Sequence, residues 1–121
     1  CLVITPFYNK PTQRGCVLHY REVAKVGLPV IMYHNPPRTG VRLTVDTIVE
    51  IGQIPGLAAM KDSTGDIEFI RQCKKASSLP ILSGDDWLSF EIMRLGGVGT
   101  IATVGNLIPK AWKTMIHLCL Q

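Results

Sequence analysis

An alternation of strand-like and helix-like segments is the feature of this sequence that most restricts its fold. Short apolar runs begin at residues 2, 29, 57, 80 and 99, and a helix-like stretch follows each of them. The runs lack apolar–polar alternation, which is typical of parallel strands buried on both faces. The sequence therefore predicts about five βα units, with strands at residues 2–5, 29–33, 57–60, 80–83 and 99–103.

The stretches between these runs predict helices with recognisable starts. We expect helices at residues 14–26, 45–51, 67–76 and 87–95, and a last helix that begins at Pro109. Thr44 and Asp66 stand where N-cap residues stand, and Asp86 is expected to cap the helix at 87–95. Within residues 67–76, Ile67, Ile70 and Cys73 share one helix face.

Five parallel strands fit either a doubly wound sheet or part of a (β/α)₈ TIM barrel. A Gly-x-Gly-x-x-Gly motif after the first run and a Walker sequence are both missing, which weakens the nucleotide-binding sheet. In a TIM barrel the carboxyl ends of the strands carry the active site. Polar residues do follow the runs here, so a partial barrel in a single domain is the favoured α/β architecture.

Composition narrows the class of protein. The chain has 121 residues, 46% apolar and 18% charged, and no segment reads as membrane-spanning. Its four cysteines lie far apart, so we expect neither disulfides nor a zinc site, and a cytoplasmic location. The net charge of +4 is scattered, which argues against nucleic acid as a partner. The chain opens inside an apolar run without Met, so we expect it to continue a longer protein.

Lys61 is the residue with the strongest chemical indication. It directly follows the run at residues 57–60, at the end where a barrel has its active site. Desolvation at such a place favours the neutral amine, which can attack a ketone. The alternative is an ordinary loop lysine paired with Asp62 or Asp66.

Other polar residues at the strand ends are candidates for supporting roles. Tyr33 and Tyr8 could transfer protons if a hydrogen-bond chain links them to the reacting atoms, or they could be ordinary packing tyrosines. Arg38 offers a bidentate fork for a carboxylate, or is a solvated loop arginine. His34 could act as a base, but a hydrogen-bonded structural histidine is the more common case.

Taken together, these motifs closely resemble the dihydrodipicolinate synthase/N-acetylneuraminate lyase family of class I aldolases. The resemblance spans essentially the whole chain and rests on five segments in the family's order, at residues 5–11, 33–40, 61–66, 82–86 and 95–101. It implies a Schiff-base enzyme that needs neither a metal nor an organic cofactor. It also implies pyruvate and a small aldehyde as substrates, and a homodimer or homotetramer.

The resemblance assigns roles to six residues of this chain. Lys61 forms the imine with pyruvate, Tyr33 donates and accepts protons, and Tyr8 completes the proton relay of a neighbouring subunit. Arg38 binds the carboxylate of aspartate semialdehyde. Gly84 and Ile101 line the pyruvate pocket, Ile101 through its backbone.

Two departures from the family pattern qualify this assignment. The usual Tyr-Asn-x-Pro reads Tyr33-His34-Asn35-Pro36 here. The five runs correspond to strands 4 to 8, so the first three strands and their pyruvate-binding threonines are absent. Despite these departures, the resemblance leads us to expect a dihydrodipicolinate synthase-type lyase of lysine biosynthesis. The alternatives are an N-acetylneuraminate lyase, a 2-keto-3-deoxy sugar acid aldolase, and a catalytically silent truncated barrel.

Overall fold

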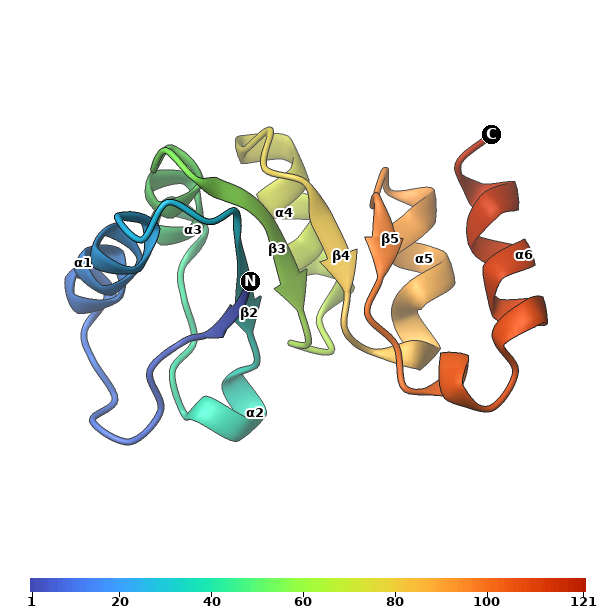
Figure 1. Ribbon diagram of the computed structural model, residues 1–121, viewed down its shortest axis with the longest axis horizontal. Helices are drawn as coiled ribbons and strands as arrows, with labels where there is room; N and C mark the ends of the chain where they lie inside the picture. The colour runs from blue at the N-terminus through green and yellow to red at the C-terminus, as the bar shows by residue number, and fades with distance from the viewer.

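A five-stranded parallel sheet forms the centre of the chain. In the computed structural model, which describes residues 1–121, the strands lie in the order β1-β2-β3-β4-β5 (Figure 1). They are β1 (Leu2–Ile4), β2 (Val30–His34), β3 (Leu57–Asp62), β4 (Ile81–Ser83) and β5 (Gly99–Thr100). The predicted α/β fold with five strands is confirmed.

Helices connect and cover the strands. They are α1 (Gln13–Ala24), α2 (Pro36–Thr39), α3 (Val45–Gly52), α4 (Ile67–Ala76), α5 (Ser89–Arg94) and α6 (Pro109–Cys119), with 3₁₀ turns η1 (Asp86–Leu88) and η2 (Val104–Asn106). α4 has the predicted bounds, and the Thr44 and Asp66 side chains accept the N–H groups of Thr47 and Phe69 as predicted caps. The helix predicted at 87–95 is instead η1 followed by α5.

The strand order places the helices on one face of the sheet. Parallel strands that are adjacent in both sequence and space are joined by right-handed crossovers, so every crossover helix lies on the same side. Figure 1 shows α1 and α3 beside each other, α4 behind β3 and β4, and α5 beside α6. A doubly wound sheet would carry helices on both faces. The arrangement is therefore a partial (β/α) barrel.

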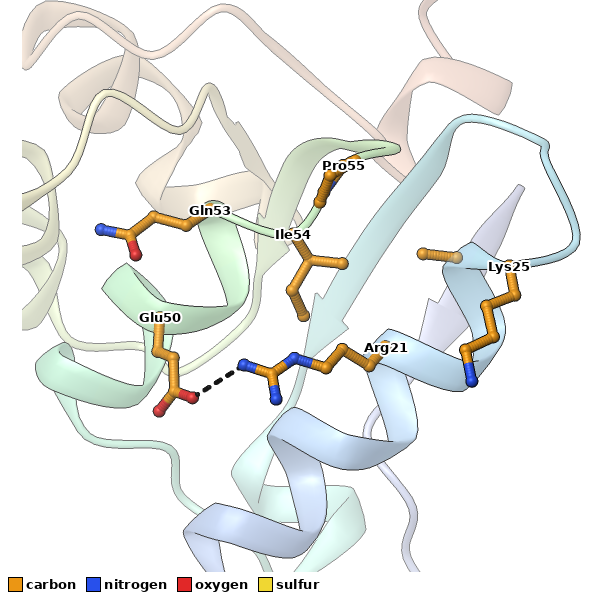
Figure 2. Close-up of a pocket in the computed structure, with 7 residues that line it drawn as sticks. Arg21, Lys25, Glu50, Gln53, Ile54 and Pro55 are labelled. Atoms are coloured by element: carbon orange, nitrogen blue, oxygen red, sulfur yellow. Dashed lines mark hydrogen bonds and ion pairs between the residues drawn. The ribbon is translucent and has the colours of Figure 1, made fainter.

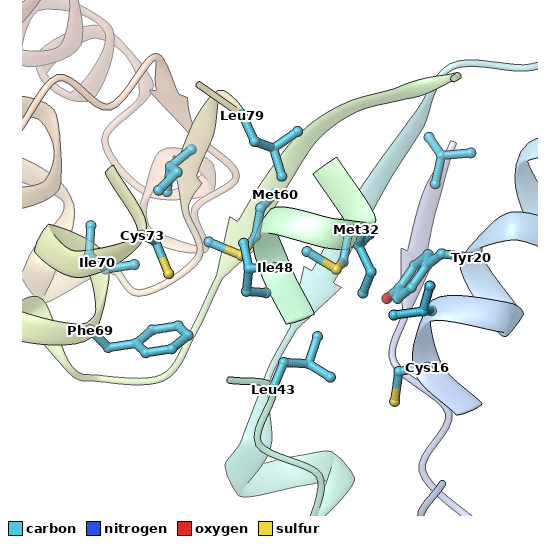
Figure 3. Packing of buried hydrophobic residues seen from close by; sticks show 14 of the residues in the cluster. Cys16, Tyr20, Met32, Leu43, Ile48, Met60, Phe69, Ile70, Cys73 and Leu79 are labelled. Carbon is cyan, nitrogen blue, oxygen red and sulfur yellow. The ribbon is translucent and has the colours of Figure 1, made fainter. Parts of the chain in front are cut away.

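Burial follows this one-sided cover. Along β2, Val30, Met32 and His34 are buried, whereas Ile31 and Tyr33 are only half-buried. Met32 and Met60 belong to a core between sheet and helices that also includes Tyr20, Ile48 and Ile70 (Figure 3). Because side chains alternate along a strand, Ile31 and Tyr33 point to the face without helices.

Two segments differ from the sequence prediction for identifiable reasons. β5 ends at Thr100 rather than at residue 103, because the Asp86 carboxylate accepts the N–H groups of Thr103 and Val104 and draws the chain into η2. The prediction that Asp86 caps the helix at 87–95 is therefore wrong, since its carboxylate binds residues 103 and 104 instead. α2 was not predicted at all, although Asn35 caps it and Gly40 ends it with a φ of 67°.

Candidate active site

One row of residues crosses the sheet at the level of Lys61. The strand pairing places Ile4 beside Tyr33, Tyr33 beside Lys61, and Lys61 beside Leu82. All of these residues point to the face without helices, since the alternate residues pack in the core. Lys61 therefore lies inside β3 rather than in the loop after it, and its side chain lies beside the Tyr33 ring.

The Lys61 side chain is buried, and its amine lies against this ring. Lys61 is 9% exposed, and its Nζ lies 4.1 Å from the centroid of the Tyr33 ring. It forms no ion pair with Asp62 or Asp66, so the loop-lysine alternative is wrong. The amine thus lies beside a phenol and has no carboxylate partner, an arrangement that suits nucleophilic chemistry.

The phenol of Tyr33 is surrounded by groups that favour its ionised form. Burial alone would raise the pKa of Tyr33, but the hydrogen bond from Asn35, the neighbouring Ser63 hydroxyl and the charges of Lys61 and Arg38 outweigh it. The pKa of this phenol therefore lies below its ordinary value. A phenol of this kind is suited to accept and return a proton.

Gly84 forms a wall of the same site. A Cβ at this position would lie 2.1 Å from Ser63 Oγ and 2.7 Å from Lys61 Cε. Ser63 is 5% exposed, and its hydroxyl has no hydrogen-bond partner. Glycine at position 84 thus lets Lys61 and Ser63 pack against the backbone that directly follows β4.

Ile101 and Arg38 lie at the rim. The Ile101 N–H donates to the Ser83 carbonyl at 2.8 Å, so this N–H is already paired and the carbonyl is the backbone group left to bind a ligand. Arg38 is exposed on α2, and its charge acts on Tyr33. Tyr8 is not brought to the site within one chain: it is 93% exposed and forms no hydrogen bond.

His34 and Asp62 form a buried pair on the opposite face of the sheet. His34 Nδ1 lies 2.9 Å from Asp62 Oδ2, and His34 Nε2 accepts the Leu43 N–H at 3.1 Å. Nε2 therefore carries no proton, and Nδ1–H donates to the carboxylate. Asp62 Oδ1 also accepts two hydrogen bonds from Thr64. His34 is thus a structural residue that braces the ends of β2 and β3.

Three features of the site were not predicted from the sequence. They are the pair of His34 with Asp62, the hydrogen bond from Asn35 to Tyr33, and the burial of the Ser63 hydroxyl without a hydrogen-bond partner. Strand alternation was the available signal for all three. Residues 34 and 62 share one face, and residues 33, 61 and 63 share the other, once β2 and β3 are aligned.

A groove elsewhere on the surface is separate from the Lys61 site. A groove of about 560 Å³ lies between α1 and α3, where Arg21 and Glu50 form an ion pair at 3.2 Å (Figure 2). Lys61 and Tyr33 do not line it. No three His, Cys, Asp or Glu side chains gather at distances that could hold a metal ion. None of the helices has the length and apolar composition to cross a bilayer.

A parallel sheet with helices on one face, and a buried lysine against a phenol at its centre, defines the chain as a lysine-centred (β/α)-barrel protein. The sequence model of the Dihydrodipicolinate synthetase family matches residues 1–121. The chain therefore belongs to this family, as its motifs had predicted.

Individual relatives agree with this assignment. The 4-hydroxy-tetrahydrodipicolinate synthase of Ralstonia nicotianae is 45% identical over 121 residues, covering 98% of this chain and 40% of the relative. The enzyme of the same name from Cellvibrio japonicus is 40% identical, covering 99% of this chain and 42% of the relative. The chain thus spans about two fifths of the length of these relatives.

Solved structures share the fold. Dihydrodipicolinate synthase from Aquifex aeolicus superimposes with a TM-score of 0.93 at 39% identity, over 98% of this chain and 42% of that one. A chloride-inhibited dihydrodipicolinate synthase from Acinetobacter baumannii, crystallised with pyruvate, gives 0.95 at 40% identity, over the same fractions.

Proposed function

We propose that this chain carries the imine-forming part of a 4-hydroxy-tetrahydrodipicolinate synthase, a lyase that condenses pyruvate with L-aspartate 4-semialdehyde in lysine biosynthesis. The observation that carries the proposal is the largely buried Lys61, whose Nζ lies 4.1 Å from the centroid of the Tyr33 ring. Family membership and the pyruvate complex of the Acinetobacter relative support it.

The chemistry begins at Lys61. Its amine attacks the ketone carbon of pyruvate, and loss of water gives a protonated imine that withdraws electrons from the methyl group. Loss of a methyl proton then gives an enamine, which attacks the aldehyde carbon of the second substrate. The amino group of the product finally displaces Lys61 and closes the ring. Covalent catalysis of this kind divides one difficult deprotonation into easier steps.

The other site residues support this sequence of steps. Tyr33 moves protons to and from the carbinolamine, since its lowered pKa suits both directions. Gly84 and the Ile101 carbonyl border the pyruvate, and Arg38 binds the second carboxylate with its planar fork. The Ser63 hydroxyl lies near the phenol of Tyr33 and helps to lower its pKa.

The proposal extends to the assembly of the protein. The five strands correspond to strands 4 to 8 of an eight-stranded barrel, and the remaining strands close the face onto which Lys61 points. The exposed Tyr8 joins the proton relay of a neighbouring copy in a homodimer or homotetramer, and the enzyme acts in the cytoplasm. One solved relative is described as a monomeric variant, so the oligomer requires its own measurement, by analytical ultracentrifugation.

The test is to trap the imine with pyruvate and sodium borohydride and then to map the adduct by peptide mass spectrometry. We expect a reduced adduct on Lys61 and none in Lys61→Arg. Exposed lysines such as Lys25, which pairs with Glu22, serve as internal controls. Adducts spread over the exposed lysines would contradict the proposal.

Absence of an adduct has two readings that a second protein separates. An adduct that forms only in a longer chain supplying further strands would show that the isolated chain is the catalytically silent form. No adduct in either protein would overturn the imine chemistry. A panel of aldehydes then separates aspartate semialdehyde from the acceptors of N-acetylneuraminate lyase and of 2-keto-3-deoxy sugar acid aldolases.

A further inference from the structure

We propose that Asn35 is a positioning residue, whose side-chain amide holds the Tyr33 phenol oxygen and links it to the helix that carries Arg38. The inference rests on the proposed function for the role of Tyr33, whereas the contacts themselves do not depend on it. Asn35 lies two residues after Tyr33, and strand alternation returns it to the side of Tyr33 while His34 points to the helices.

The two ends of the Asn35 amide have different partners. Its Nδ2 donates to Tyr33 Oη at 2.7 Å, and its Oδ1 accepts the Arg38 N–H at 3.3 Å. The Arg38 backbone can only donate at this point, so the oxygen of the amide must face it and the NH₂ must face the phenol. One side chain thereby fixes two site residues relative to each other.

The backbone around Asn35 restrains the amide. The Asn35 carbonyl accepts hydrogen bonds from the Thr39 hydroxyl and the Thr39 N–H, both at 3.0 Å. Asn35 is 6% exposed and Thr39 is 2% exposed, so both are shielded from competing water. The NH₂ group therefore has little freedom to leave the phenol.

The hydrogen bond from Asn35 favours the ionised form of the Tyr33 phenol. Asn35 offers only N–H groups to Tyr33 Oη, so it stabilises the oxygen as an acceptor and leaves the phenol proton directed elsewhere. Burial raises the pKa of Tyr33, and the hydrogen bond from Asn35 is the foremost of the influences that lower it. Asn35 thus prepares Tyr33 to accept a proton without touching substrate.

Two substitutions separate this role from helix capping. Asn35→Ser and Asn35→Asp both keep an oxygen that can cap α2, since Ser and Asp are good N-cap residues. Both lose the Nδ2 donor to Tyr33: the serine hydroxyl is one bond shorter than the amide, and the aspartate carboxylate has no donor and adds a negative charge beside the phenol. Asn35→Ala, which loses the cap as well, is the comparison for a purely structural effect.

The measurement is an NMR titration of tyrosines labelled with ¹³C at Cζ, with Tyr33→Phe assigning the signal. We expect the ionised fraction of Tyr33 at a fixed pH to fall about tenfold in Asn35→Ser and further in Asn35→Asp, because both variants lose the amide donor that stabilises the phenolate. The rise with pH of pyruvate methyl-proton exchange, which requires ionised Tyr33, should move to higher pH in both variants.

The outcomes are distinguishable from those of the proposed function. An unchanged Tyr33 titration in folded Asn35→Ser and Asn35→Asp would refute the positioning role. Failure of both variants to fold would also count against it, because Asn35 would then serve the architecture alone. If neither this chain nor a longer chain supplying further strands forms an imine with pyruvate, the proposed function fails, while the Tyr33 titration still decides the role of Asn35.

Discussion

Replacing Gly84 by alanine tests how closely the site is packed. The added Cβ would lie 2.1 Å from Ser63 Oγ, 2.7 Å from Lys61 Cε and 2.9 Å from the Asp62 carbonyl oxygen. The two side chains can rotate away, but the carbonyl belongs to the backbone of β3. We therefore expect the substitution to move the Lys61 amine and to strain the pairing of β3 with β4.

The size of the effect follows from these contacts. Overpacking by one methyl group in a close-packed region costs about 1–3 kcal/mol, and the short contact with a backbone atom places Gly84→Ala in the upper part of this range. Gly105→Ala is the matched control, because its Cβ would meet only Trp112 Cδ1, at 3.6 Å. We expect that control to change the free energy of unfolding by less than about 0.5 kcal/mol.

Urea denaturation measures the free energy of unfolding, and borohydride trapping measures the reactivity of Lys61. Adding Ser63→Ala to Gly84→Ala removes the shortest contact and should recover about 1 kcal/mol. The reasoning is refuted if Gly84→Ala is as stable as Gly105→Ala and still traps pyruvate on Lys61.

Three further predictions address the supports of the site. His34→Leu should lower the free energy of unfolding by about 3 kcal/mol, because it leaves Asp62 Oδ2 and the Leu43 N–H without a buried partner. Thermal or urea denaturation measures this, and a loss below about 1 kcal/mol would be inconsistent with it. Asp66→Ala should cost about 1 kcal/mol at neutral pH and Asp66→Asn much less. The Phe69 N–H lowers the pKa of Asp66, so this stabilisation is present above the usual carboxyl range and is lost as the pH falls through the lowered pKa. A pH series of unfolding curves shows whether the stability advantage of the unsubstituted chain over Asp66→Ala shrinks in acid. EDTA should leave the yield of the pyruvate adduct unchanged, and a loss restored by added metal would contradict the metal-free imine chemistry.

Helix signals were predictable because they are local. The bounds of α4 follow from Asp66 at its N-cap and from its apolar face, and both signals lie within a few residues of the helix. α2 was missed because Pro36-Pro37 reads as a loop until Asn35 and Gly40 are seen to cap its two ends. The early end of β5 was missed because Asp86 acts on residues far along the chain.

The sequence indicated which residues belong to the site, but not how their side chains are arranged. Lys61, Tyr33, Arg38, Gly84 and Ile101 all lie at the carboxyl edge of the sheet, as the motif positions indicated. Tyr8 was also expected at an active site, but within one chain it stays exposed, and its role in a neighbouring copy remains a prediction.

The sequence by itself determined the βα alternation, the parallel sheet, the caps at Thr44 and Asp66 and the family, because each depends on residue types at fixed short spacings. Only the tertiary structure decided which side chains meet. The register of β2 against β3 sets Tyr33 beside Lys61 on one face and His34 beside Asp62 on the other. A shift of that register by one residue would separate both pairs, since the side chains of a strand alternate between its faces. Register depends on packing between distant segments, and for that reason the chemistry of this site is a property of the folded sheet.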